Sequence, residues 1–458
     1  MTRRQVPVLA ALGALAIGAV LVGAFILGSP QARPTPAAPG SPTHSSAALA
    51  TSPAVVPTPI PTSNPLAGAL DPTFLAGLGT PGRTFVETHM PANAFETKAS
   101  LALDPTGRIY LEIDGSYASS GMNADVWLRI VRYTSAGPDP TFAVFHADAM
   151  DDTGSTLIGP LILADRLAVE FDNFAGGASF ALLSPSGARA GIIGVPNPVR
   201  GAIGYTGDAI ARGGQSLLAC VDNDPILGTK ASIVELTPPG GPGASLATTT
   251  FGSLDLWTCR TLVARSDGGV LAAGATTSLQ HDNSPIGIEA RSSSGGPDTI
   301  FAGGGVAPIQ TTHAQVISHG LVPSGDGSVV VGLDVIGSDG TPVQAVLERL
   351  TGAGQADPTF GNAGVLELTA AGAACRLTAI AAQSDGRVLA ATSCVSGGTT
   401  TSELVRLMAD GRGDPTFGKD GHLQVGEPTG AMLVEPSGEL LGVSILDDGR
   451  ISLWRRLL

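Results

Sequence analysis

The chain has 458 residues, of which 62 are glycine and 34 are proline, while only 14% are charged and 4% aromatic. Such a composition is typical of many short strands joined by turns around an aliphatic core. Only three charges, all arginines, precede residue 69, so the rest of the chain carries 22 basic and 39 acidic residues. Their formal net charge of −17 repels nucleic acid and anionic lipid, and favours cations, neutral glycans or basic protein surfaces as partners.

The first predicted element is a membrane segment. Arg3 and Arg4 are followed by an uncharged apolar run over residues 6–28, and a helix of that length crosses the ~30 Å hydrocarbon core. Basic residues stay inside, so the remainder is predicted to be extracellular. The alternative is a cleaved signal peptide and a secreted protein, although such peptides have an apolar region of only ~7–15 residues, and "SPQA", which ends at Ala32, is a poor cleavage site. We predict a single-pass anchor within residues 1–28.

Residues 29–68 are the second element, a tract rich in proline, alanine, serine and threonine. Frequent proline without periodicity does not bury a core and favours extended polyproline conformations. The tract is therefore predicted to be a disordered, semi-rigid linker that separates the following domain from the membrane.

From residue 70 onward a hairpin pattern recurs, in which an apolar strand, an Asp-Gly or Ser-Gly turn and a second apolar strand follow one another. Two degenerate copies, around Asp165 and Gly214, lie between the first and second clear ones. Seven hairpins result, 49 to 59 residues apart. The turn glycines of the clear copies are Gly107, Gly268, Gly327, Gly386 and Gly438.

A third apolar strand follows each hairpin, and then DPTF or a worn version of it, DTIF at 298 or TTTF at 248, leads into one more strand. Four-stranded units of about 55 residues, repeated seven times, predict an all-β fold, a seven-bladed β-propeller. The domain is predicted over residues 69–458, with blades at roughly 75–142, 143–191, 192–250, 251–300, 301–359, 360–416 and 417–458.

The DPTF motif has a physical reason. Its aspartate accepts the backbone N–H two residues on and its proline fixes φ, so the turn is predicted to lead from the outer strand of one blade to the inner strand of the next. Calcium binding by these aspartates is an alternative, but calcium takes about six to eight oxygens and each turn offers one carboxylate; we predict no cofactor, with Ca²⁺ as the alternative. The phenylalanines predicted to pack between blades are Phe74, Phe142, Phe251, Phe301, Phe360 and Phe417.

Ring closure is also predicted. The last strand, residues 450–458, has no DPTF after it, whereas "LDPTF" at residue 70 has no strand before it. Residues 70–75 are therefore expected beside the C-terminal strand.

The segment from Arg349 to Gly421, with "DPTFGNAG", "SDGRVLA" and "LVRLMADGRGDPTFG", resembles the delta-60 repeat of bacterial exported proteins. The resemblance covers residues 70–458, most strongly in units 4, 6 and 7. It implies a propeller-like array in envelope or extracellular proteins, without a shared catalytic activity or ligand.

The four cysteines are predicted to form two disulfides. Cys375 and Cys394 flank the turn at Gly386 almost symmetrically, which places them opposite one another on paired strands. Cys220 and Cys259 are predicted to bridge neighbouring blades, with buried free thiols as the alternative.

Long, variable connections are predicted on the face opposite the stereotyped turns, where repeat scaffolds carry recognition residues. They cover residues 87–100, 114–125, 145–155, 221–230 and 276–285. A cation or glycan site in these loops is one interpretation, and ordinary solvated loop residues are the other. The candidate binding residues are Asp148, Asp151, Asp152, Asp222, Asp224, His281 and Asp282, with Tyr117, Met90 and Trp127 as contact residues.

The sequence contains no G-x-S-x-G, H-E-x-x-H, Walker or C-x-x-C motif. Enzymatic activity is therefore not the expected function, although propeller enzymes assemble sites from scattered loops. We predict a surface-tethered module that binds protein or polysaccharide. The alternatives are an extracellular hydrolase or lyase acting on glycans, and a purely structural envelope protein.

Overall fold

The computed structural model describes residues 67–458 apart from several loop segments. Residues 61–458 form one compact unit. The segments outside the description are 79, 89–93, 119–123, 150–157, 174–176, 196–204, 223–229, 239–246, 278–284, 310–315, 325, 338–339, 369–372 and 447.

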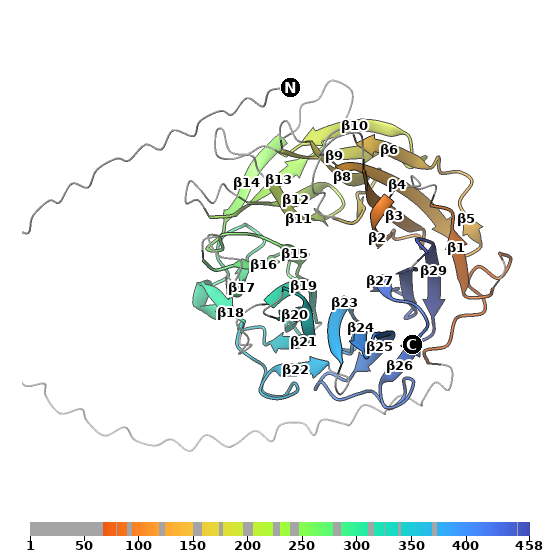
Figure 1. Cartoon of the computed structure of the whole chain (residues 1–458). Helices are drawn as coiled ribbons and strands as arrows, with labels where there is room; N and C mark the ends of the chain where they lie inside the picture. The colour runs from red at the N-terminus through yellow and green to blue at the C-terminus, as the bar shows by residue number, and fades with distance from the viewer. Residues whose placement is uncertain are drawn as a thin grey trace, which may run out of the picture. The chain divides into compact units, whose positions relative to one another are not determined.

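Seven antiparallel sheets follow one another around a ring, which is a seven-bladed β-propeller (Figure 1). Blade 1 consists of β2 (Ala94–Leu103), β3 (Ile109–Ala118), β4 (Ala124–Thr134), β5 (Gly137–Pro138) and β6 (Phe145–Ala149). Blade 2 consists of β7 (Leu161–Ile162), β8 (Leu167–Asn173), β9 (Gly177–Leu183) and β10 (Arg189–Gly194). Blade 3 consists of β11 (Tyr205–Arg212), β12 (Ser216–Asp222), β13 (Ser232–Thr237) and β14 (Ala247–Ser253).

The remaining four blades are more regular. Blade 4 consists of β15 (Thr261–Ala264), β16 (Val270–Ala275), β17 (Ile286–Arg291) and β18 (Val306–Pro308), with the short 3-10 helix η2 (Phe301–Gly304) before β18. Blade 5 consists of β19 (Val316–Pro323), β20 (Val329–Ile336), β21 (Pro342–Leu350) and β22 (Val365–Leu368). Blade 6 consists of β23 (Ala374–Ala382), β24 (Val388–Ser396), β25 (Thr399–Leu407) and β26 (His422–Val425). Blade 7 consists of β27 (Thr429–Val434), β28 (Leu440–Ile445), β29 (Ile451–Arg456) and the N-terminal strand β1 (Arg83–Val86).

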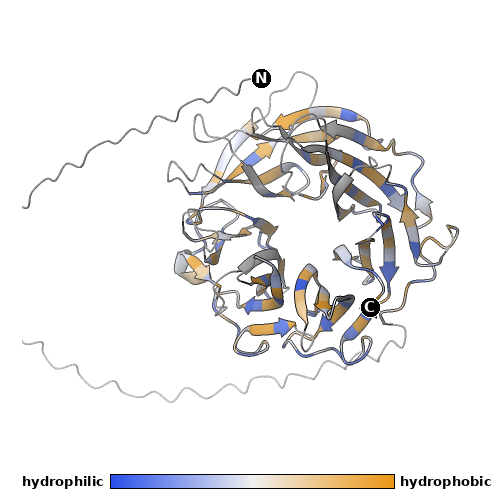
Figure 2. Cartoon of the chain, in the orientation of Figure 1, coloured by the Kyte–Doolittle hydropathy of each residue, from blue (hydrophilic) through white to orange (hydrophobic). Residues whose placement is uncertain are grey.

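The hydrophobic core lies between blades. The second strand of each blade has a neighbouring blade on both faces, and β12, for example, is buried at every residue. Apolar residues dominate these inner strands (Figure 2). One core cluster joins Val330 of blade 5 to Leu377 of blade 6, and another joins Leu389 of blade 6 to Leu440 of blade 7. Cohesion of the ring therefore depends on packing from blade to blade.

The DPTF turn occupies a different place from the one predicted. The strand that follows it, such as β22, pairs with the third strand of the same sheet and not with the next sheet. The turn thus connects strands 3 and 4 within one blade, and each sheet starts one strand later than the corresponding predicted unit. The error arises because a short alternating strand fits the edge of either neighbouring sheet equally well. The worn motif TTTF is no turn at all, because its four residues lie inside β14.

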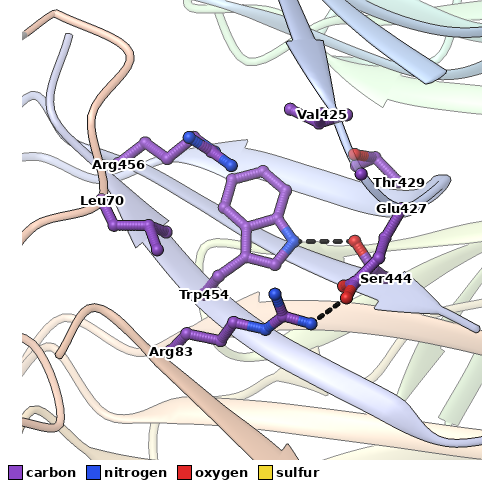
Figure 3. Close-up of a pocket in the computed structure, with 9 residues that line it drawn as sticks. Leu70, Arg83, Val425, Glu427, Thr429, Ser444, Trp454 and Arg456 are labelled. Atoms are coloured by element: carbon purple, nitrogen blue, oxygen red, sulfur yellow. Dashed lines mark hydrogen bonds and ion pairs between the residues drawn. The ribbon is translucent and has the colours of Figure 1, made fainter. Parts of the chain in front are cut away.

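The predicted ring closure is confirmed. The residues from 70 onward bridge the C-terminal strand, since Leu70 pairs with Arg456 and β1 pairs along β29. A small cavity of about 40 Å³ remains at this junction, with the Trp454 indole between Arg83 and Arg456 (Figure 3). The indole N–H donates to the Ser444 hydroxyl at 2.9 Å.

Two faces of the ring follow from the strand order. The face that we call the turn face carries the hairpins between strands 1 and 2 and the connections between strands 3 and 4. The opposite face, the loop face, carries the connections between strands 2 and 3 and those between blades. The predicted blades began one strand earlier, so the strand numbers on either side of each connection differ from those predicted. The predicted loops nevertheless lie together on one face, as expected.

Candidate functional site

The structure places four of the predicted binding and contact residues, Tyr117, Trp127, Asp148 and Asp222, in strands. Asp148 lies in β6, with its Cα opposite that of Trp127, and Tyr117 lies in β3. The Trp127 side chain is only 2% exposed, and its ring meets His146 edge to face at 6.0 Å, so it belongs to the core. The residues Met90, Asp151, Asp152, Asp224, His281 and Asp282 lie outside the described residues.

Asp222 is buried and links two blades. It ends β12, and its carboxylate accepts a hydrogen bond of 2.7 Å from the backbone N–H of Cys259, next to blade 4. Burial raises its pKa to about 6 although that hydrogen bond and Arg260 oppose the shift. Asp222 therefore has a structural partner inside the ring, where the sequence suggested a solvated loop residue.

Asp208 makes a second link across the same junction. Its Oδ2 accepts the N–H of Leu262 at 2.6 Å and its Oδ1 accepts that of Ala209 at 2.8 Å. The residue is partly exposed as a whole, but its carboxylate is enclosed, and burial raises its pKa to about 7 against these two hydrogen bonds. Both carboxylates take a proton in a pH range where most aspartates are ionised.

Both predicted disulfides are present. Cys375 and Cys394 are directly opposite residues of β23 and β24, and they are joined within blade 6. Cys220 of β12 is joined to Cys259, which precedes β15, with a Cα–Cα distance of 5.8 Å that suits a disulfide. The second bond links blades 3 and 4 beside Asp222. All four cysteines of the chain are therefore paired.

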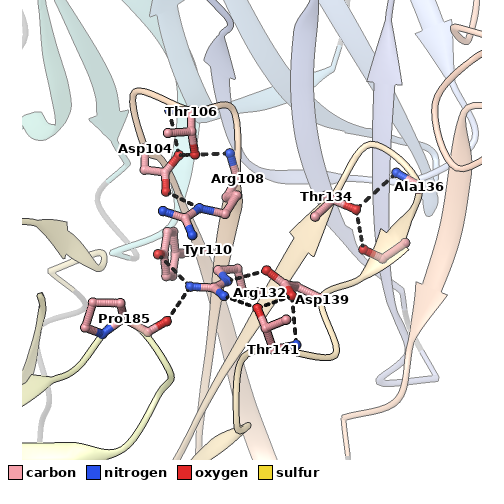
Figure 4. Close-up of polar contacts among 11 residues, drawn as sticks. Asp104, Thr106, Arg108, Tyr110, Arg132, Thr134, Ala136, Asp139, Thr141 and Pro185 are labelled. Carbon is pink, nitrogen blue, oxygen red and sulfur yellow. Dashed lines mark hydrogen bonds and ion pairs between the residues drawn. The ribbon is translucent and has the colours of Figure 1, made fainter. Parts of the chain in front are cut away.

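The turn face carries a recurring group that we call the Arg–Asp–Phe clamp. In blade 1, Arg132 of β4 pairs with Asp139 of the DPTF turn at 2.8 Å and stacks over Phe142 at 4.7 Å (Figure 4). The Asp139 carboxylate also accepts the N–H and hydroxyl of Thr141, as the turn chemistry predicted. The same clamp recurs as Arg455, Asp71 and Phe74 in blade 7, and as Arg406, Asp414 and Phe417 in blade 6.

In blades 1 and 5 the residues of this turn also fasten the blade to the next one. Arg132 donates to the Pro185 carbonyl of blade 2 at 2.6 Å, and the N–H of Ala143, after the phenylalanine, donates to Ser186 at 2.7 Å. Gly361 of blade 5 makes the equivalent bond to Asp410 of blade 6 at 3.1 Å. The predicted burial of the phenylalanines is confirmed, because all six are at most 9% exposed.

Sequence reasoning missed the arginine of the clamp. Its signal is an arginine close to the end of the third strand, in "VRYT", "ERLT", "VRLM" and "WRRL". The DPTF aspartates, proposed as alternative calcium ligands, have these arginines as partners, for example Asp357 with Arg349 at 3.2 Å. In the part of the chain that the structure describes, no three His, Cys, Asp or Glu side chains come together as metal ligands.

A pocket of about 230 Å³ lies between blades 5 and 6. Its polar wall contains His422, whose Nδ1 lies 3.1 Å from the Glu403 carboxylate, and Glu367 of β22.

Among the described residues, which begin at 67, no helix is long and apolar enough to cross a membrane. The predicted anchor at residues 6–28 and residues 29–66 of the predicted linker lie outside that part of the chain.

Comparison with known proteins supports the fold. The family described as "Domain of unknown function (DUF5122) beta-propeller" matches residues 383–417, which run from the first hairpin of blade 6 to its DPTF phenylalanine. No curated protein matches the chain.

Several solved structures are similar at low identity. A glucose dehydrogenase is 13% identical with a TM-score of 0.37, over 65% of this chain and 96% of that one. The β-propeller domain of the Trilobed protease from Pyrococcus furiosus is 9% identical with a TM-score of 0.40, over 79% and 96%. The soluble aldose sugar dehydrogenase from Escherichia coli is 12% identical with a TM-score of 0.34, over 65% and 96%. At such scores these similarities carry no inference about activity.

Proposed function

We propose that the chain is a membrane-tethered extracellular β-propeller that binds a protein or polysaccharide through its loop face. The observation that carries the proposal is the point where the N-terminal segment joins the ring. Gly68 donates a hydrogen bond to the carbonyl of Leu457, which in turn donates to the carbonyl of Ala69. Both bonds lie at the turn face, so the described chain enters the ring at that face and its entry does not cover the loop face.

The two faces also differ in how their residues are used. On the turn face, the charged and aromatic side chains of the clamps contact one another within the ring. On the loop face, the connection between strands 2 and 3 varies from Gly397–Gly398 in blade 6 to residues 223–231 in blade 3 and 276–285 in blade 4. Connections of unequal length on a rigid repeat scaffold are typical of recognition surfaces.

Extracellular location is supported by the two disulfides, since such bonds persist in oxidising compartments. The quoted repeats resemble the delta-60 repeat of bacterial exported proteins, and the match of residues 383–417 to a β-propeller family is consistent with a propeller repeat. The apolar run at residues 6–28 supplies the anchor. Mass spectrometry of the protein extracted from cells would test the tether: we expect an intact N-terminus, whereas a start near residue 33 would assign a secreted form.

Binding would be tested with labelled domain 67–458 on a glycan array and on an array of extracellular proteins. A matched variant replaces the connections 223–231 and 276–285 by the two-glycine turn of blade 6 and leaves the turn face intact. We expect selective binding by the wild type that is lost in the variant, with an unchanged thermal midpoint. Absence of binding by the wild type, or equal binding by both, would contradict the proposal.

A further inference from the structure

A pocket of about 590 Å³ opens on the turn face between blades 1 and 2. Its walls are the first hairpins of blades 1, 2 and 3 and the connection that follows β9. This volume falls within the ~300–1,000 Å³ typical of small-molecule sites. The pocket is separate from the loop face, so it is independent of the proposed function.

The pocket arises where blade 2 departs from the repeat. In blade 1 the first hairpin closes between Asp104 and Arg108, but in blade 2 it closes between Leu163 and Arg166, one residue shorter. Blade 2 also has no DPTF turn, because β9 leads through a single turn at Ser184 directly into β10. The blade 1 clamp borders this hollow through the contact of Arg132 with the Pro185 carbonyl, whereas blade 2 supplies no clamp of its own.

The polar part of the wall contains two ion pairs, together with Thr106 and Ser184. The Arg108 Nε donates to Asp104 at 2.7 Å, and Arg166 binds Asp165 through both carboxylate oxygens at 2.7 and 2.5 Å. Burial opposes ionisation of Asp104, but hydrogen bonds from Thr106 and Arg108 outweigh it and lower its pKa. The hydrogen bond from Arg166 lowers the pKa of Asp165. Both pairs are thus charged, and their charges cancel.

The rest of the wall is apolar. Tyr110, Leu163, Leu167 and Pro185 contribute to it, and Figure 4 shows the Arg108 guanidinium between Asp104 and the Tyr110 ring. A wall of this kind offers neighbouring hydrogen-bond donors and acceptors beside an apolar surface. Its net charge is zero, so it does not attract an ionic ligand. A hydroxyl both donates and accepts, so two neighbouring hydroxyls match one arginine–carboxylate pair.

We propose that this pocket binds a neutral mono- or disaccharide, with vicinal hydroxyls on the arginine–aspartate pairs and the C–H face of the sugar ring against the apolar wall. A free anion or cation gains nothing from charges that already cancel. An extended peptide is less suited, because the pocket lies at the turn ends of the blades and offers no free strand edge for main-chain pairing.

The test is saturation-transfer NMR on domain 67–458 with cellobiose, maltose, diacetylchitobiose and lactose at millimolar concentration. We expect transfer to at least one of these sugars. Ala164→Trp, which places an indole at the short hairpin, should abolish it, and Arg108→Ala should weaken affinity about tenfold, the loss of one charged hydrogen bond. The matched control is Ser384→Trp at the equivalent hairpin of blade 6, where binding should be unchanged.

Thermal unfolding of each variant verifies that the ring is intact, and Arg108→Lys, which keeps the charge but loses the planar guanidinium, should bind between the wild type and Arg108→Ala. The variant with shortened loop-face connections should retain sugar binding, so failure of the proposed function and failure of this inference are distinguishable. Transfer to none of the four sugars, transfer that survives Ala164→Trp, or preferential binding of acetate, phosphate or a peptide would overturn the assignment.

Discussion

Blades 6 and 2 show what the repeated turn does in this ring. Blade 6 has the full clamp, in which Arg406 pairs with Asp414 at 2.9 Å and stacks over Phe417, and Arg387 reaches the same carboxylate at 3.0 Å. Blade 2 has neither the motif nor an arginine at that position, because its third strand ends at Leu183. A pocket of about 230 Å³ lies between blades 5 and 6, and a larger one of about 590 Å³ borders blade 2.

The difference teaches that the DPTF sequence is more than a local turn. Its aspartate holds an arginine from the neighbouring strand, and that arginine, together with the residue after the phenylalanine, contacts the next blade. A blade without the motif keeps its four-stranded sheet but lacks these hydrogen bonds to the next blade on the turn face. We therefore expect cohesion of the ring to be strongest around blades 5 to 7 and weakest at blade 2.

The largest effect is expected from Phe417→Ala. Phe417 is completely buried between blades 6 and 7, and truncation of such an aromatic costs about 3–5 kcal/mol. Urea unfolding of domain 67–458 measures the loss. Phe251→Ala is the comparison, because Phe251 of blade 3 is 9% exposed and its motif is no turn; its loss should be smaller, and an equal loss would argue against the special role of the turn.

Removal of the clamp carboxylate should come next. Asp414→Ala leaves two arginines without their shared partner, and breaking a buried pair in this way costs about 3 kcal/mol. The control is Asp410→Ala, whose partner Arg412 is 80% exposed, so that pair contributes at most about 1 kcal/mol. Chemical denaturation would show the contrast; similar losses in both variants would mean that the clamp carries little of the cohesion.

Much of this contrast was predictable from the sequence. Turn chemistry and strand alternation are local rules, so the seven four-stranded units, the Asp-to-N–H bonds and the buried phenylalanines followed from "DPTF" and the hairpin glycines. The pairing of Cys375 with Cys394 followed from their symmetric positions about the turn, and that of Cys220 with Cys259 was predicted as a bridge between neighbouring blades, with free thiols as the alternative. Which sheet the strand after DPTF joins did not follow, because its short alternating pattern carries no information about its partner.

The candidate site was less predictable. Asp222 looked like a loop residue because aspartate is common in loops, yet its carboxylate accepts a backbone N–H across a blade junction. Trp127 looked like a contact residue, but its neighbours in β3 and β6 enclose it. The pocket between blades 1 and 2 lies at a hairpin that is one residue shorter than its equivalent in blade 1. Comparison of the repeat units shows the missing residue, but the pocket itself follows only from the positions of the neighbouring blades.

The two disulfides differ in what they join. The Cys220–Cys259 bond links blade 3 to blade 4, whereas the Cys375–Cys394 bond lies within the sheet of blade 6. Replacing Cys220 and Cys259 together by serine should lower stability by about 2–4 kcal/mol. The same change at Cys375 and Cys394 should cost about 0.6 kcal/mol less, because the closed loop has a sequence separation of 19 rather than 39. Thermal unfolding compares the two; a larger loss for the pair within blade 6 would contradict this ordering.

A pH dependence of opposite sign is expected at two junctions. Asp222 and Asp208 have pKa values raised to about 6 and about 7, so the folded state holds their protons where the unfolded state has released them. Stability should rise as pH falls from about 7 towards 4, by up to about 1.4 kcal/mol per pH unit for each proton. Asp222→Asn and Asp208→Asn should flatten this rise.

At Asp414 the sign is reversed. Burial opposes its ionisation, but Thr416 and two arginines outweigh it and lower its pKa, so its contribution is present above the unfolded value and is lost as pH falls below about 4. Urea midpoints measured from pH 8 to pH 3 should therefore pass through a maximum near pH 4 to 5. A monotonic increase of stability with pH would show that the junction between blades 3 and 4 does not titrate in this way.

Native-state hydrogen exchange tests the unequal cohesion of the ring most directly. Amides of β20 and β24, in blades joined by clamps, should exchange about tenfold or more slowly than those of β8 in blade 2, and Asp414→Ala should reduce that difference. Protection of β8 equal to or greater than that of β20 and β24 would contradict the account.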